Sequence, residues 1–373
     1  MHRTAELTSE SPLIAPIEAF FTPARLSMVP VQPGVTRENM DKASDNPPLT
    51  VAMSVYNGER FLAAAVRSVL EQTFADFEFL ILDDGSTDSS AAMIREFAQA
   101  DSRIRPILRE NRGLVASLNQ MLEVARAPIV ARMDADDICR PDRFARQMAF
   151  LAANPDHGVV GSWSEDIDEA GRPWRACGVD HGVTNAELQE VAQRGGQLMV
   201  HPAVMYRKHI VQEVGGYHAA FRHCEDYDLW LRLASETKMA NIPERLLCYR
   251  HYPQQVSKTH VTEQSVGAAV SYEAWRARQA GRSDPTADLD RLPPIESLDA
   301  LFGEAGVSSR VRARVTRGIL HSRTALRDGG LDIVLRHVAD GGARDGLWRT
   351  AARLIRYGEP TRALRLSCAL LAA

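Results

Sequence analysis

The sequence predicts an α/β protein with a mainly parallel sheet that is flanked by helices and followed by a C-terminal helical region. Apolar segments alternate with helical patterns from Pro48 onward, and polar clusters follow the apolar segments. Alternating strands and helices form βαβ units, which build a parallel sheet with helices on both faces. A third observation, the Arg-rich helical pattern after about residue 258, predicts the C-terminal helical region.

Five apolar segments predict buried strands, because they are short and bounded by turn residues. In chain order they are LTVAMSVYN from Leu49, FEFLILDDGSTD from Phe77, IRPIL from Ile104, PIVARM from Pro128 and HGVVGSW from His157. The first ends at Asn57-Gly58, and the second is stopped by Asp83, Asp84 and Gly85.

Helical spacing of apolar residues predicts helices between these strands. The clearest cover residues 59–73, 113–125 and 141–153. In the first of them Leu62, Val66 and Val69 share one face, and Pro141 stands in the first turn of the last, where proline is well tolerated.

The chain divides into three predicted parts. Residues 1–47 show no sustained periodicity and are expected to form a tail that is partly disordered or loosely docked. Residues 48–258 hold the α/β pattern, and residues 259–373 are Arg-rich and α-helical in pattern. The last region could pack on the α/β domain or form a homodimer, and the sequence is compatible with both arrangements.

Composition excludes several classes of protein. The 373 residues include 48 acidic and 44 basic side chains, so the net charge of −4 argues against a nucleic-acid binder. The five cysteines are scattered without a C-x-x-C pair, which suits a reducing compartment rather than a disulfide framework or a zinc module. With no signal-peptide pattern or membrane-spanning run, the expectation is a cytoplasmic protein, with peripheral association at the inner face of the membrane left open.

Polar clusters follow the predicted strands at what should be one edge of the sheet. They cover residues 56–58, 83–86, 111–113 and 134–137. Ligands of open α/β sheets bind outside the carboxyl ends of the strands. The sequence therefore predicts a binding site along this edge.

Three carboxylates, Asp134, Asp136 and Asp137, come directly after a buried strand. In an extended segment Asp134 and Asp136 point to the same side. Two converging carboxylates suit Mg²⁺ or Mn²⁺, which complete their shells with water and substrate phosphates. The alternative is that Asp136 or Asp137 caps the helix near Pro141.

The cluster Asp83–Thr87 suggests nucleotide recognition, since a carboxylate at a strand end can accept hydrogen bonds from a base or a ribose. The alternative is an ordinary helix cap. The chain has neither G-x-G-x-x-G after the first strand nor G-x-x-x-x-G-K-[ST], which argues against a dinucleotide site and a P-loop.

Asp226 is the candidate general base. On a helix it shares the apolar face of Leu229, Trp230 and Leu233. Partial desolvation would raise its pKa and strengthen it as a base, while the helix N-terminus opposes that rise. The alternative is that Glu225 and Asp226 are simply acids of the first helical turn.

Further along, Arg250, His251 and Lys258 could face phosphates, and His251 could be a third metal ligand. A lone histidine is more often structural. His201, in MVHPAVMYRK, has the same ambiguity.

Taken together, these motifs resemble an inverting family 2 glycosyltransferase with the GT-A fold, a Rossmann-like architecture. The resemblance spans residues 49–257 and rests on an ordered set of segments. These are VAMSVYNGERFLAAAVRSVLEQTFADFEFLILDDGSTDSS, NRGLVASLN, ARMDADDICRPDRFARQ, VGGY and EDYDLWLRL.

The resemblance implies roles for individual residues. Asp226 would be the general base of the E-D motif, while Asp134 and Asp136 would form the D-x-D motif that holds ribose and a metal-bound diphosphate. The family often has a histidine where this chain has Tyr252, one place after His251. The donor side would comprise Tyr56, Asn57, Glu59, Asp84, Asn111, Arg112, Gly113 and Asp134, and the acceptor side Glu225, Trp230 and His201.

The expected activity is transfer of a sugar, with inversion, from a nucleotide-sugar donor, UDP-linked by expectation, to a hydroxyl group in glycan or polysaccharide biosynthesis. The expected cofactor is Mn²⁺ or Mg²⁺. The acceptor could be a glycan, a lipid-linked saccharide or a protein. The alternatives are a sugar-nucleotide nucleotidyltransferase, for which YNGERF is a poor phosphate loop, and a non-catalytic carbohydrate-binding module.

Overall fold

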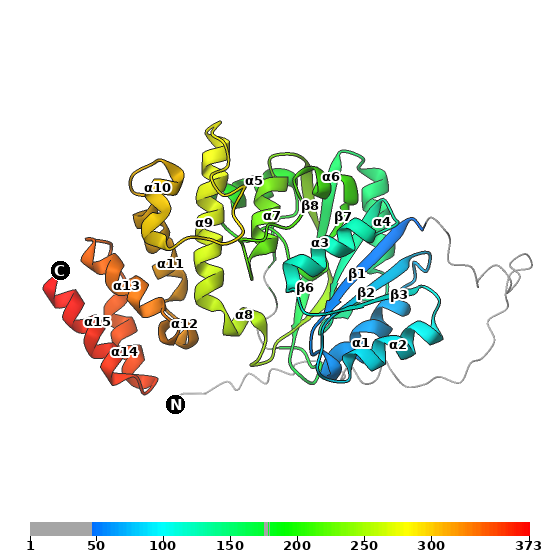
Figure 1. The fold of residues 1–373 in the computed structure, drawn as a ribbon, viewed down its shortest axis with the longest axis horizontal. Helices are drawn as coiled ribbons and strands as arrows, with labels where there is room; N and C mark the ends of the chain where they lie inside the picture. Colours follow the sequence, from blue (N-terminus) through cyan, green and yellow to red (C-terminus); the bar gives the residue numbers. More distant parts are fainter. Residues whose placement is uncertain (1–46, 175–177, 179) are drawn as a thin grey trace, which may run out of the picture.

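The computed structural model describes residues 47–174, 178 and 180–373. The predicted tail, residues 1–47, therefore lies outside the described residues except for its last position. Within the described residues, an α/β domain is followed by a set of helices that ends at the C-terminus (Figure 1).

One eight-stranded sheet organises the α/β domain, in the order β3-β2-β1-β4-β7-β6-β8-β5. Its strands are β1 (Leu49–Val55), β2 (Glu78–Asp84), β3 (Ile104–Arg109), β4 (Ile129–Asp134), β5 (Ile138–Cys139), β6 (His157–Ile167), β7 (Met205–Arg207) and β8 (Lys238–Arg250). The block β3-β2-β1-β4 is parallel, and so is the pair β6-β8. The strand β7 runs antiparallel to β4 and β6, and β5 antiparallel to β8. This architecture, a mixed sheet flanked by helices and followed by C-terminal helices, confirms the predicted fold class.

Helices cover both faces of the sheet because the strand residues alternate between two apolar clusters. The helices of this domain are α1 (Glu59–Leu70), α2 (Ser90–Ala100), α3 (Leu114–Val124), α4 (Arg143–Ala153), α5 (Asn185–Arg194), α6 (Lys208–Glu213) and α7 (Glu225–Leu233), with a short 3-10 turn at His201–Ala203. Phe79 and Ile81 of β2 pack in the cluster that holds α1, α2 and α4. Leu80 and Leu82 face the cluster that holds α3, α5, α6 and α7.

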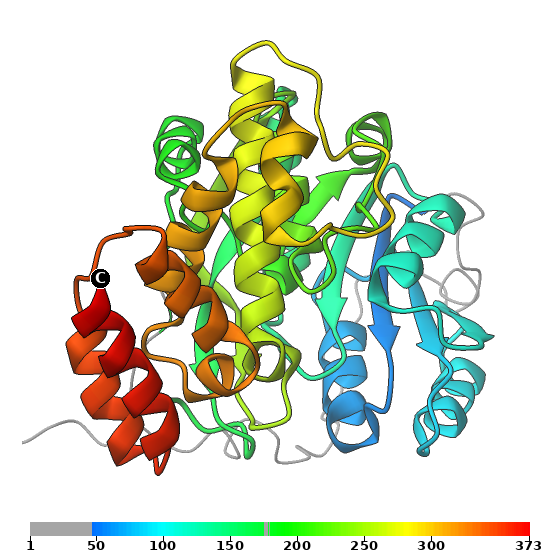
Figure 2. The ribbon, with the colours of Figure 1, turned by 60° about the vertical axis from the view of Figure 1, so that its left-hand side comes forward.

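The helices of the C-terminal region pack in one apolar cluster, which also includes Ala220, Phe221 and Cys224 from just before α7. The helices of this region are α8 (Val256–Thr259), α9 (Val261–Gln279), α10 (Leu298–Phe302), α11 (Val307–Ile319), α12 (Arg323–Arg327), α13 (Gly330–Ala339), α14 (Leu347–Arg356) and α15 (Pro360–Ala372), with a 3-10 turn at Ile295–Ser297. Figures 1 and 2 show α9 between the sheet domain and the last helices. None of the helices in the described part of the chain is long and apolar enough to cross a bilayer.

Close packing joins the two parts at α9. A Cβ atom built on Gly267 would lie 2.2 Å from Sγ of Cys224, the residue just before α7. Trp275 of α9 is buried in the cluster that also holds Trp230 of α7. Helix α9 therefore packs directly on α7, the helix that carries the predicted base.

Candidate active site

A cavity of about 690 Å³ brings several of the predicted site residues together. Asp134 reaches it from the end of β4 and Asp136 from the turn that follows, while Glu225 and Asp226 reach it from the start of α7. The carboxylates singled out in two distant parts of the sequence thus share one space.

The three aspartates after β4 form a compact acidic cluster. Asp134, Asp136 and Asp137 each offer a carboxylate oxygen, and these atoms lie within 4.8 Å of one another. Burial raises the pKa of Asp136 to about 6, and the charge of Asp134 adds to the rise. Burial also raises the pKa of Asp137 well above its usual range. Crowded carboxylates of this kind are stabilised by a cation.

Two neighbours fix the orientation of these carboxylates. The hydroxyl group of Tyr252 donates to Oδ2 of Asp136 at 2.9 Å. The backbone N–H of Arg250 donates to Oδ1 of the buried Asp137 at 2.8 Å. Asp137 is therefore tied to β8, whereas Asp134 and Asp136 line the cavity.

Arg132 is a functional candidate that the sequence analysis did not single out. Its side chain is 2% exposed, lines the cavity and pairs with Asp134. Arginine is almost never fully buried without a partner. The signal was present in the sequence, since one charged residue interrupts the apolar strand PIVARM.

Glu225 and Asp226 open α7 toward the cavity. Burial raises the pKa of Glu225 to about 8, assisted by the charge of Asp226. Burial raises the pKa of Asp226 to about 6, against hydrogen bonding by the backbone of Tyr227. A carboxylate with this pKa is ionised at neutral pH and is a stronger base than a solvated aspartate.

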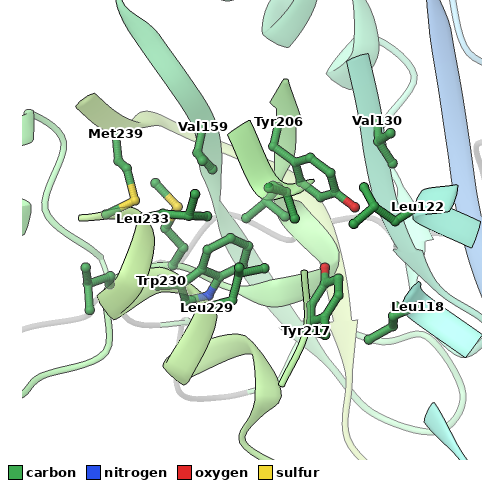
Figure 3. Packing of buried hydrophobic residues seen from close by; sticks show 14 of the residues in the cluster. Leu118, Leu122, Val130, Val159, Tyr206, Tyr217, Leu229, Trp230, Leu233 and Met239 are labelled. Carbon is green, nitrogen blue, oxygen red and sulfur yellow. The ribbon is translucent and has the colours of Figure 1, made fainter. Parts of the chain in front are cut away.

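His201 and Trp230 lie in the wall of the same cavity. Nε2 of His201 is 3.1 Å from the hydroxyl oxygen of Tyr217, and its ring meets Trp230 edge-on at 5.9 Å between centroids. Burial and the charge of Arg132 hold the pKa of His201 well below its usual value, so the imidazole is neutral. Figure 3 shows Trp230 packed among apolar residues, with the hydroxyl groups of Tyr206 and Tyr217 turned toward one another.

His251 lines the cavity but is not part of the cluster formed by Asp134, Asp136 and Asp137. Its Nε2 atom lies 3.1 Å from Oδ1 of Asp166, and its ring lies against Trp174. The neighbouring Tyr252, rather than His251, contacts the acidic cluster.

The predicted nucleoside residues after β1 connect two loops at the edge of the sheet. Oδ1 of Asn57 accepts from the backbone N–H of Thr87 at 2.8 Å, and Oε2 of Glu59 accepts from that of Ser89 at 3.0 Å. Tyr56 is 56% exposed beside them. These residues do not line the cavity, so they form a separate part of the candidate site.

Asp84 organises the loop that contains Asn111, Arg112 and Gly113. Its carboxylate accepts from the backbone N–H groups of Arg112 at 3.0 Å and Gly113 at 2.8 Å, and from the guanidinium of Arg109. Asn111 and Arg112 are exposed at the tip of this loop. Asp84 thus orders the predicted donor-side loop, with its own oxygens already engaged.

Comparison with known proteins agrees with this architecture. The profile described as "Glycosyl transferase family 2" matches residues 50–215. A UDP-Gal:alpha-D-GlcNAc-diphosphoundecaprenol beta-1,3-galactosyltransferase of Escherichia coli is 30% identical over 65% of this chain and 88% of its own.

The fold resembles those of solved structures. S. aureus TarS 1–349 in complex with UDP aligns with a TM-score of 0.52 at 14% identity, covering 87% of this chain and 90% of that one. The mannosyltransferase PcManGT from Pyrobaculum calidifontis, in complex with GDP-Man and Mn²⁺, aligns with a TM-score of 0.52 at 17% identity and covers 88% of each chain.

The fold and the ordered motifs define a glycosyltransferase of the GT-A class. The chain belongs to glycosyltransferase family 2, which confirms both the resemblance and the enzyme class predicted from the sequence.

Proposed function

We propose that this glycosyltransferase inverts the anomeric carbon as it moves a sugar from a nucleotide-sugar, UDP-linked in our proposal, to a hydroxyl group of a glycan acceptor. The observation that carries the proposal is the sharing of one cavity by Asp134, Asp136 and Asp226. Asp134 and Asp136 suit a metal-bound diphosphate, and Asp226 suits a general base. Family membership favours this activity over a nucleotidyltransferase or a carbohydrate-binding module.

Asp226 is the proposed general base. It takes the proton of the acceptor hydroxyl, whose oxygen attacks the anomeric carbon from the face opposite the nucleotide. The bond from that carbon to the diphosphate oxygen breaks, so a β-linked product follows from an α-linked donor. General-base assistance of this kind accelerates a reaction by roughly 10²–10⁴-fold.

The acidic cluster fits a hard divalent cation. It offers only oxygen ligands, it holds three carboxylates within 4.8 Å, and burial raises the pKa of two of them. In our proposal Asp134 and Asp136 hold Mn²⁺ or Mg²⁺. When bound, such an ion acts as a Lewis acid that stabilises the charge of the leaving diphosphate.

The remaining assignments extend this arrangement. Asp84 orders the loop at residues 111–113 against the nucleoside, while Tyr56, Asn57 and Glu59 form the adjoining edge of the donor site. Glu225, Trp230 and His201 form the acceptor side. The E. coli relative is named for a diphosphate-linked lipid acceptor, so a lipid-linked glycan is a reasonable acceptor class for this chain, and a glycan or protein remains an alternative.

A thermal-shift screen of nucleoside diphosphates with and without Mn²⁺ tests the donor and metal assignments. The correct nucleotide at a hundredfold excess over Kd stabilises the fold by about 2.7 kcal/mol. We expect that stabilisation to require the metal and to disappear in the Asp134→Ala/Asp136→Ala variant. Stabilisation that is equal without metal, or equal in the variant, would contradict the metal site. The anomeric configuration of the product, read by NMR, tests inversion.

A further inference from the structure

The C-terminal helices supply part of the wall of the active-site cavity. Gln264 and Ala268 of α9 and Arg314 of α11 line it together with the residues at the start of α7. Arg314 is half-buried there. A cationic side chain from outside the family 2 match thus faces the same space as Asp226.

The position of Arg314 is defined by contacts on two sides. Its guanidinium carbon lies 4.0 Å from the centroid of the Tyr272 ring, and Nη2 donates to the carbonyl oxygen of Gly195. Gly195 has a left-handed backbone with a φ of 67°, and a Cβ atom there would lie 1.7 Å from Nη2. A side chain at position 195 would have to displace this guanidinium, which is held by the carbonyl oxygen of Gly195 and the ring of Tyr272.

The charge of Arg314 has no carboxylate partner among the described residues. Its neighbours on α11 differ in this respect, since Arg310 pairs with Glu273 and Arg312 pairs with Asp340. The other arginine of the cavity wall, Arg132, pairs with Asp134. A guanidinium has five N–H donors, so Arg314 keeps several for a ligand.

Arg314 and the proposed base line the same cavity. Tyr227, the residue after Asp226, is near enough to Arg314 to feel its charge, which opposes the rise that burial causes in the Tyr227 pKa. A ligand whose hydroxyl group meets Asp226 would therefore extend toward α11.

We propose that Arg314 binds an anionic group of the acceptor, a phosphate or a carboxylate, and so orients the acceptor hydroxyl toward Asp226. This inference rests on the proposed function of the cavity. It assigns the C-terminal helices a role in choosing the acceptor, because a fixed guanidinium fork matches phosphate and carboxylate oxygens. The phosphate would come from a lipid-linked acceptor and the carboxylate from an acidic sugar.

The test measures binding of small probes to the full chain saturated with UDP and Mn²⁺, so that the donor site is occupied. The probes are phenyl phosphate, methyl β-D-glucuronide and the neutral methyl β-D-glucoside, followed by ligand-observed NMR titration. We expect one anionic probe to bind at least about tenfold more tightly than the neutral one, and Arg314→Gln to weaken it by about ten- to a hundredfold. The preferred anion distinguishes phosphate from carboxylate.

Two further variants keep the result interpretable. Arg317→Gln removes an equal charge from an exposed position on the same helix and should change nothing. Arg314→Lys retains the charge and should bind the anionic probe more tightly than Arg314→Gln does. This comparison separates loss of the charge from a folding defect. Equal binding of anionic and neutral probes, or unchanged binding in Arg314→Gln, would overturn the proposal. Failure of UDP and Mn²⁺ to stabilise the wild-type chain would instead count against the proposed function.

Discussion

Nη1 of Arg132 lies 2.5 Å from Oδ1 of Asp134 in the wall of the cavity, although the arginine side chain is 2% exposed. Arg132 therefore acts on both acidic groups of the cavity, Asp134 through the ion pair and Glu225 and Asp226 through its charge. Burial raises the pKa values of Glu225 and Asp226, and the positive charge of Arg132 opposes both rises. Arg132 is therefore a positioning residue that holds the carboxylate of the proposed base in its ionised form.

Replacing Arg132 by methionine should raise the pKa of Asp226 above its value of about 6. Because the base acts when it is ionised, activity rises with pH through this pKa. We expect the acidic limb of the kcat/KM profile to move to higher pH in Arg132→Met, measured by nucleotide release. Arg132→Lys, which keeps the charge, should leave the limb closer to its wild-type position. An unmoved limb in Arg132→Met would show that the ion pair serves stability alone.

The Asp226→Asn variant should lose turnover by roughly 10²–10⁴-fold, because the acceptor hydroxyl no longer has a group to receive its proton. Donor binding should persist, since Asp226 is not part of the acidic cluster. Steady-state transfer assays and nucleotide titration measure the two quantities separately. Normal sugar transfer by Asp226→Asn would exclude Asp226 as the base.

The acidic cluster should make the metal-free protein less stable as the pH rises. Burial first, and then the charge of Asp134, raises the pKa of Asp136 from 3.8 to about 6 in the folded state. Between these two values the folded state binds more protons than the unfolded state, so the free energy of unfolding falls as the pH rises through this window.

Urea unfolding in EDTA at pH 4.5 and 7 measures this effect. We expect Asp136→Asn to be more stable than the wild type at pH 7 by roughly 2 kcal/mol, allowing for partial solvent screening, and the difference to shrink at pH 4.5. Asp288→Asn, at an exposed position, is the control and should show no such gain. A loss of stability in Asp136→Asn at pH 7 would mean that the hydrogen bond from Tyr252 outweighs the repulsion.

The alternating strands and helices of residues 49–163 followed from local patterns, because each element carries its own apolar period. β8 could not be predicted in this way. Pro243 and Glu244 interrupt the apolar pattern of this strand. They lie at a bulge where the register with β6 shifts, so neither residue has to pair with β6. The antiparallel β7 has only three residues. A strand of this length is too short to show the alternation of apolar and polar residues by which strands are predicted.

The residues of the candidate site also fall into those that local sequence patterns predict and those that they do not. The carboxylates Asp134, Asp136 and Asp226 could be found from local pattern, because Asp134 ends β4, Asp136 lies in the turn after it and Asp226 lies in the first turn of α7. Tyr252 contacts Asp136 from more than a hundred positions away in the sequence. Arg314 reaches the cavity only because the C-terminal helices pack on the α/β domain through α9. Such contacts are set by tertiary packing, which no local period encodes.

The contact between Gly267 and Cys224 provides a test of how α9 is attached to the α/β domain. A Cβ atom at Gly267 would lie 2.2 Å from Sγ of the buried Cys224, so Gly267→Ala must displace the thiol or the helix. Overpacking of this kind typically costs about 1–3 kcal/mol. We expect a loss of that size in the free energy of unfolding, together with weaker binding of any ligand that needs both α7 and α9.

Two matched variants identify the cause. Gly318→Ala alters a glycine of α11 whose nearest neighbour would be Oγ of Ser265 at 3.9 Å, so it should be neutral or stabilising. The double variant Gly267→Ala/Cys224→Ala removes the colliding sulfur and should recover most of the loss, because the two sites are in direct contact and their effects cannot simply add. If the double variant is as unstable as Gly267→Ala, the steric account fails, and the glycine must be needed for another reason. If it recovers stability and ligand binding together, then the seating of α9 on α7 controls the shape of the cavity wall.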